Sequence, residues 1–167
     1  MPDLSFVKIG AAMYHLIVRS KLRRAFRDIN AGAYECILPQ FAPRHRHTMY
    51  GCHALAGERR TVRSTTLWYE RLKRLLPDLR FEVRRIAVAG WPWDTVATVD
   101  WTDHFTLPDG SPGSNQGVHV FGLRWGKVQT LAIHCDTARL QAYCERMAAL
   151  GLKEALADPI QDPPDGA

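Results

Sequence analysis

The sequence predicts an α+β fold in which helices pack on one face of a curved antiparallel sheet. Two observations carry this prediction: helical spacing of apolar residues dominates the first half of the chain, and four strand-like runs follow one another in the second half. Helices first and antiparallel strands last are typical of α+β domains. A chain of 167 residues without repeats is long enough for one domain with a sizeable core.

The first half of the chain is predicted to be mainly helical. Apolar residues recur at helical spacing over residues 4–29, and Gly32 is suited to the left-handed position that ends a helix. A short second helix is predicted over residues 33–41 and a short strand over residues 44–51. Helical spacing returns over residues 61–76, which predicts a third helix that stops at "PD".

The second half is predicted to form a four-stranded meander closed by a helix. β-branched and aromatic residues dominate four runs, at residues 79–90, 95–107, 115–125 and 127–135. The long turn "LPDGSPGSNQG" separates the second run from the third, and "WGK" forms a tight turn between the third and the fourth. Residues 136–156 are predicted to form the last helix, with Asp136 or Thr137 as its N-cap.

Charge and cysteine usage limit the class of protein. Lys and Arg exceed Asp and Glu by 22 − 17 = 5. Because these charges are dispersed along the chain, we interpret them mainly as solvated faces of helices; binding of nucleic acid, anionic lipid or an acidic partner is the alternative interpretation. The four cysteines form no CxxC pair, which predicts reduced thiols in a cytoplasm. The apolar N-terminal segment is too short to cross a membrane. We expect one cytoplasmic domain over residues 1–157 and a disordered tail over residues 158–167.

Five stretches, taken in order, resemble the nuclear transport factor 2-like superfamily, which includes SnoaL-type polyketide cyclases, ketosteroid isomerases and limonene epoxide hydrolases. The stretches are "INAGAYECILPQFAPRHRHTMYG", "LWYERLKRLLPDLRFEV", "VATVDWTDHF", "GVHVFGLRWGKV" and "HCDT". Their order and spacing carry the resemblance, since each alone is a weak motif. It implies a cone-shaped, curved sheet that wraps the N-terminal helices and encloses a deep apolar pocket, and it implies a homodimer.

Within such a cone, two residues become candidate catalytic groups. Side chains alternate between the faces of a strand, so Asp100 lies on one face of its strand and Asp103 on the other. We expect Asp100 to face the pocket together with His119 of the next strand, and Asp103 to lie on the outer face, either solvated or in a dimer contact. Burial among apolar groups would shift the pKa of Asp100 and His119 toward values that suit a general base and a proton donor.

The resemblance transfers the family's catalytic groups only in part. Ketosteroid isomerases carry a tyrosine and an aspartate base where this sequence has Ala25 and Thr48, so that route is not expected. Limonene epoxide hydrolases match at Asp100 but not at Thr98. In SnoaL-like cyclases a histidine matches His119, and the catalytic aspartate falls at Ile133 of this sequence; Asp136 lies three residues later and can serve there or cap the last helix.

Five further residues are candidates for substrate contact. Asn115 can hold a substrate oxygen or close the preceding turn, and His47 can point into the mouth of the pocket. Aromatic residues form the pocket wall or pack in the core, at Trp68, Trp101 and Phe121. His45 and His47 have a spacing that can hold a metal, but no acidic ligand follows at a suitable distance, so we predict no metal and no cofactor.

These observations lead to three functional hypotheses. The first is a cofactor-free enzyme that uses acid–base chemistry for isomerisation, cyclisation, dehydration or hydrolysis of an apolar, ring-type small molecule. The second is a non-catalytic module that binds such a molecule. The third is nucleic-acid binding through the arginine-rich first helix, which the dispersed charge disfavours. No membrane partner is expected.

Overall fold

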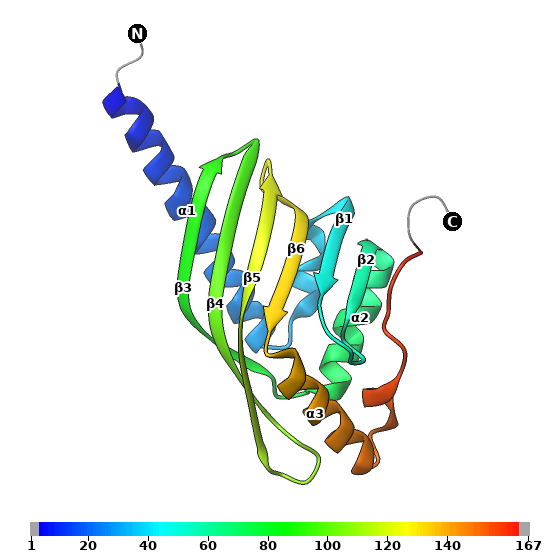
Figure 1. Ribbon diagram of the computed structural model, residues 1–167. Helices are drawn as coiled ribbons and strands as arrows, with labels where there is room; N and C mark the ends of the chain where they lie inside the picture. The colour runs from blue at the N-terminus through cyan, green and yellow to red at the C-terminus, as the bar shows by residue number, and fades with distance from the viewer. Residues whose placement is uncertain (1–3, 164–167) are drawn as a thin grey trace.

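The computed structural model describes residues 4–163, with side chains from residue 10 onward, and it confirms the α+β class. A curved six-stranded sheet packs against helices that lie on one of its faces (Figure 1). The elements in chain order are α1 (Leu4–Asn30), η1 (Tyr34–Cys36), η2 (Leu38–Gln40), β1 (Phe41–Met49), β2 (Gly57–Thr61), α2 (Val62–Leu75), β3 (Arg80–Trp91), β4 (Asp94–Thr106), β5 (Pro112–Arg124), β6 (Lys127–Cys135), α3 (Thr137–Ala149) and η3 (Lys153–Leu156). None of the described helices is long and apolar enough to span a bilayer.

The sheet has the order β2-β1-β6-β5-β4-β3. Strands β3 to β6 form the predicted antiparallel meander, whereas β1 pairs with β6 in parallel. Strand β2, which the sequence analysis did not predict, is a short edge strand rich in charge, "GERRT". Figure 1 shows α1 and α2 behind the sheet and no helix over most of its opposite face.

Local sequence signals set the ends of several elements. Thr61 caps α2 through a reciprocal capping box with Ser64, and Asp136 caps α3 by accepting the backbone N–H of Arg139. Trp125 and Gly126 both have positive φ, at 51° and 77°, which fits the two-residue turn between β5 and β6.

Two predicted helices differ from the structure. The helix predicted over residues 33–41 is two single 3₁₀ turns interrupted at Ile37, after which the chain enters β1. The last helix was predicted to continue to residue 156, but α3 ends at Ala149 because Gly151 takes φ 99°.

The core lies between the concave face of the sheet and helices α1 and α2. Helix α1 contributes Val18, Leu22, Phe26 and Ile29, and α2 contributes Trp68, Tyr69 and Leu72. On β4 the buried side chains alternate strictly from Thr95 to Phe105, so one face of this strand points inward along its whole length. This inward face carries the polar groups of the candidate site.

Residues 158–163, here the C-terminal strap, do not form the free tail that the sequence predicts. The strap runs along β2: the backbone N–H of Asp162 donates to Glu58 O (3.0 Å), and the buried Arg59 guanidinium donates to Ile160 O (3.1 Å). The Asp162 carboxylate accepts from Arg60 N (2.6 Å) and Ser64 Oγ (2.6 Å) at the start of α2. The rest of the predicted tail, residues 164–167, lies outside the described residues.

The Asp162→Ala variant is expected to lower the free energy of unfolding by about 1–2 kcal/mol, the usual cost of losing a charged group at a helix N-terminus. Burial disfavours the Asp162 carboxylate, but the hydrogen bonds from Ser64, Arg60 and Thr61 outweigh it and lower the pKa. Urea unfolding followed by circular dichroism at pH 7 would measure the change. Asp158→Ala is the matched control, since the bond from Arg71 uses only the Asp158 carbonyl; equal effects of the two variants would contradict this role.

Candidate functional site

Two adjoining cavities lie between the helices and the concave face of the sheet. The outer cavity, about 80 Å³, is lined by α1, η2, β5 and β6, and its exposed lining residues Ile17, Lys21 and Gly126 mark its mouth. The inner cavity, about 40 Å³, lies deeper, under α2 and α3, and its lining includes Trp101, Asp103 and Asn115. Three residues line both cavities, Ile29, Tyr69 and His119. His119 therefore stands where the two cavities meet.

His119 is held by a hydrogen bond that fixes its tautomer. Trp101 Nε1 lies 2.6 Å from His119 Nδ1, and because an indole nitrogen can only donate, Nδ1 must accept. Gly117, which pairs with Trp101 across the strands, makes room for the indole: a Cβ there would lie 2.8 Å from the Trp101 ring. Burial lowers the pKa of His119 to about 3. The ring is therefore neutral near pH 7 and carries its proton on Nε2.

The His119 ring sits in an aromatic enclosure. Phe26 and Phe81 meet it edge-on, with ring centroids 5.3 and 5.9 Å away, and Phe121 stacks against it at 5.9 Å. No residue in the described part of the chain accepts a hydrogen bond from His119 Nε2–H. The site therefore presents one N–H donor in apolar surroundings, where a hydrogen bond to a developing negative charge is strong.

Asp103 is the buried carboxylate of the site. It lines the inner cavity with His119, is 8 % exposed, and accepts the backbone N–H of Asn115 at 2.5 Å. Burial raises the pKa of Asp103 to about 6, although the hydrogen bond from Asn115 and the neighbouring His104 act in the opposite direction. A carboxyl group with this pKa is half-ionised at about pH 6 and mostly ionised at pH 7, which suits a general base.

The prediction that Asp100 shares the pocket with His119 is wrong. In the register of β4 and β5, Asp100 pairs with Val118, and Val99 pairs with His119. Directly opposed residues of neighbouring strands point to the same face, so Val99 and Asp103 lie on the face of His119 and Asp100 on the other. Asp100 is exposed in a shallow hollow on the far side of the sheet, and the prediction that Asp103 is the solvated residue is also wrong.

The five candidate substrate contacts divide into two groups. Phe121 lines the outer cavity, and Trp68 and Trp101 line the inner one. The Asn115 amide is occupied, because it donates to Asp136 O (3.0 Å) and accepts from Gln116 N (2.8 Å). Asn115 therefore positions Asp103 through its backbone.

His47 does not reach the mouth of the pocket. It is fully buried between Trp68 and Tyr69, with ring centroids 4.6 and 5.9 Å away, and neither of its nitrogens has a hydrogen-bond partner in the described part of the chain. The nitrogens of neighbouring His45 are both occupied, by Ala42 O and Thr65 Oγ1 at 2.7 Å each. Among residues 4–163 no group of three His, Cys, Asp or Glu side chains could hold a metal ion.

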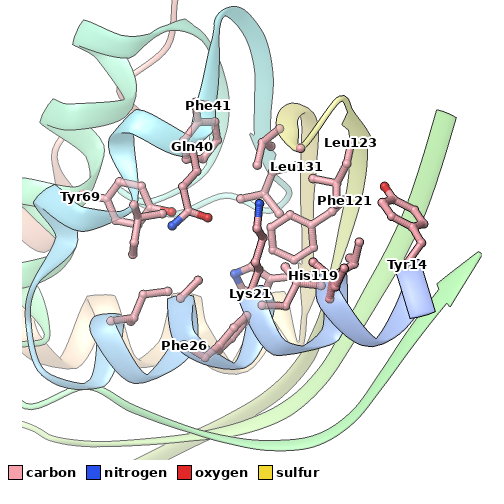
Figure 2. Close-up of a pocket in the computed structure, with 18 residues that line it drawn as sticks. Tyr14, Lys21, Phe26, Gln40, Phe41, Tyr69, His119, Phe121, Leu123 and Leu131 are labelled. Carbon is pink, nitrogen blue, oxygen red and sulfur yellow. The ribbon is translucent and has the colours of Figure 1, made fainter. Parts of the chain in front are cut away.

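The sequence did not identify Tyr69, Lys21 and Gln40 as polar residues that line the cavities. The hydroxyl of Tyr69, whose pKa is raised by burial, has no hydrogen-bond partner within the described residues and belongs to a residue shared by both cavities. At the outer end Lys21 rises from α1, and the Gln40 amide points into the same space (Figure 2). The sequence pattern does not single out Tyr69 or Lys21, because both lie within helices whose apolar residues keep a regular helical spacing on either side of them.

Solved structures with the same fold come from several bacteria. An NTF2-like protein of unknown function from Burkholderia pseudomallei has a TM-score of 0.67 at 18% identity, covering 75% of this chain and 95% of that one. IdmH, a putative polyketide cyclase from Streptomyces antibioticus, has a TM-score of 0.60 at 13% identity, covering 76% and 97%. AclR, a putative hydroxylase from Streptomyces galilaeus, has a TM-score of 0.60 at 18% identity, covering 78% and 83%. At these identities, the similarities show a common fold.

No curated protein sequence matches the chain significantly. The family model of SnoaL-like domains matches residues 22–130, from the second half of α1 into β6. This span contains Asp103 and His119 and covers more than half of the chain. The resemblance to the NTF2-like superfamily, first carried by short motifs, is thereby confirmed: the protein belongs to the family of SnoaL-like domains.

Proposed function

We propose that the protein is an enzyme that moves a proton next to a carbonyl group of an apolar, ring-type small molecule. The observation that carries this proposal is a pair of groups that both line the inner cavity: a neutral imidazole locked as an Nε2–H donor and a buried carboxylate with a pKa of about 6. IdmH, a putative polyketide cyclase of the same fold, supports this class of substrate.

The chemistry follows from the protonation states. The Asp103 carboxylate takes a proton from a carbon next to the substrate carbonyl, and the electron pair of that C–H bond forms a C=C bond while the carbonyl π pair moves onto oxygen. His119 Nε2–H donates a hydrogen bond to this oxygen, and the hydroxyl of Tyr69, which lines the same cavity, is a candidate for a second donor. Where the enolate is conjugated, Asp103 can return the proton to another carbon, which gives isomerisation. In cyclisation the enolate carbon attacks a second carbonyl carbon, the π pair of that carbonyl moves onto its oxygen, and this oxygen takes the proton from Asp103.

The proposal predicts exchange of α-protons even without knowledge of the natural substrate. In D₂O at pH 7.5 the protein should accelerate deuterium incorporation next to the carbonyl of 1-tetralone, a bicyclic ketone, as followed by proton NMR. His119→Ala should slow this exchange about 10²- to 10³-fold, the usual effect of removing one oxyanion donor. Exchange at the rate of the buffer alone, with 1-tetralone shown to be bound, would overturn the enzymatic proposal.

A binding module without catalysis is the second candidate. The family's other catalytic positions are occupied here by Ala25, Thr48, Thr98 and Ile133, which carry no acid or base. Under this alternative an apolar ligand binds in the cavities and its α-protons exchange no faster than in buffer. Native mass spectrometry of the purified protein would detect such a ligand and separate this case from an empty cavity.

We also propose a homodimer formed through the uncovered face of the sheet (Figure 1). Beside polar residues such as Asp100 and His134, this face carries the half-exposed Val96 and the partly buried Val118 and Val120. Sedimentation should give a mass of 2 × 18.9 = 37.8 kDa. Val118→Lys together with Val120→Lys should shift it to the monomer; a wild-type monomer would refute the dimer.

A further inference from the structure

The mouth of the outer cavity carries one cation that the fold leaves unpaired. Lys21 is the only lysine or arginine among the eighteen residues that line this cavity, and none of the eighteen is acidic. No described carboxylate forms an ion pair with Lys21. Its ammonium group reaches across the mouth toward the turn between β5 and β6, so that a Cβ added to Gly126 would lie 3.7 Å from Nζ. The lining therefore carries an uncompensated positive charge beside an apolar interior.

The residues that line the outer cavity between Lys21 and His119 are apolar. From Lys21 inward, α1 presents Leu22, Ala25 and Phe26, and the sheet presents Phe121 and Leu131. His119 contacts Phe26, which lies five residues beyond Lys21 on α1, or roughly 7.5 Å along the helix axis. One cavity thus has an ammonium group at its mouth, an apolar middle and an N–H donor at its inner end.

Building on the proposed function, we infer that the substrate is an apolar ring compound that carries a carboxylate. In this arrangement the carboxylate lies at Lys21, the ring fills the apolar middle, and the carbonyl reaches His119 Nε2–H; Figure 2 shows Lys21 and His119 in the lining of this cavity. A carboxylate at this place forms an ion pair next to a low-dielectric wall, where the attraction exceeds that at a fully solvated surface. A neutral ring compound of the same shape lacks this interaction. Lys21 is thereby assigned as the residue that determines specificity for acids.

A matched pair of ligands tests this inference. The fluorescence of the protein would be titrated with 2-naphthoate and with 2-naphthamide, which share the ring system and differ in charge. The wild type should bind the naphthoate about five- to tenfold more tightly than the amide at low salt. Lys21→Met keeps the length of the side chain without its charge and should abolish this preference, so that the ratio of the two affinities falls to about one.

Arg24→Met is the control, because Arg24 is an exposed cation of the same helix that does not line the cavity. It should retain the preference; an equal loss in both variants would trace the preference to the overall basic charge and overturn the assignment to Lys21. Equal wild-type affinity for the two ligands would overturn the inference and leave the apolar pocket of the proposed function intact. Binding of neither ligand would contradict both.

Discussion

The His119→Gln variant is expected to tolerate acid better than the wild type. Between pH 7 and pH 4 the wild type should lose about 3 kcal/mol more of its free energy of unfolding than the variant. Burial lowers the pKa of His119 to about 3 in the folded protein, against 6.5 for a free side chain. As the pH falls below 6.5, the imidazole binds a proton in the unfolded chain but stays neutral in the folded chain. The free energy of unfolding is therefore unaffected by His119 above pH 6.5 and decreases as the pH falls from 6.5 toward 3.

Urea unfolding at pH 4, 5, 6 and 7 would measure this difference. The amide oxygen of the substituted glutamine would still offer an acceptor to the Trp101 indole, so the comparison isolates the titration of the ring. His134→Gln, on the exposed face of β6, is the control and should leave the pH dependence unchanged. Parallel curves for wild type and His119→Gln would show that His119 does not resist protonation. His45, His47 and His53, whose pKa values burial also lowers, act in the same direction in all of these proteins.

The Asp103→Asn variant is expected to lose catalysis and gain stability. Without the carboxylate no base accepts the substrate proton, so exchange of 1-tetralone α-protons should fall about 10²- to 10⁴-fold. In the wild type this exchange should rise with pH through about 6, since only ionised Asp103 is active. The free energy of unfolding should change in the opposite sense: the variant gains little near pH 4 and about 3 kcal/mol above pH 7, because burial of the ionised carboxylate is costly.

The sign of that gain follows from the raised pKa. A carboxyl group with a folded pKa of about 6 and an unfolded value near 3.8 favours folding in its protonated form, and its destabilising effect sets in as the pH rises between these values. Asp100→Asn is a close control, because it removes a carboxylate three residues away on the opposite face of β4. If Asp100→Asn abolished exchange and Asp103→Asn did not, the assignment of the base to the concave face would be refuted.

Most of the fold could be predicted because local signals and long-range packing agree. The meander, the turn at Trp125 and the cap at Asp136 all follow from residue types at short range. Strand β2 could not be predicted, since "GERRT" has no alternation of apolar residues and is held as a strand by β1 and the strap. The strap itself looks disordered in sequence because its contacts use backbone groups and one carboxylate.

The candidate site was half predictable. His119 follows from the resemblance, and the structure places it at the junction of the cavities. The choice between Asp100 and Asp103 required knowing which face of β4 is buried. The binary pattern contained that answer: Ala97, Val99 and Trp101 precede Asp103 on one face, whereas polar residues alternate on the face of Asp100. The apolar pattern of β4 therefore predicts the buried face of the strand more reliably than alignment to the catalytic aspartate of a distant family.

The C-terminal strap has a consequence for handling the protein in solution. Strand β2 ends the sheet, and an open strand edge invites pairing with the edge of another molecule. The strap bonds to β2 through Asp162 N–H and Glu58 O and so occupies part of this edge. Shortened chains that end before residue 158 would expose it, along with the guanidinium of Arg59. Purification tags and fusion partners are therefore best attached after residue 163, where the edge stays covered and intermolecular strand pairing is suppressed.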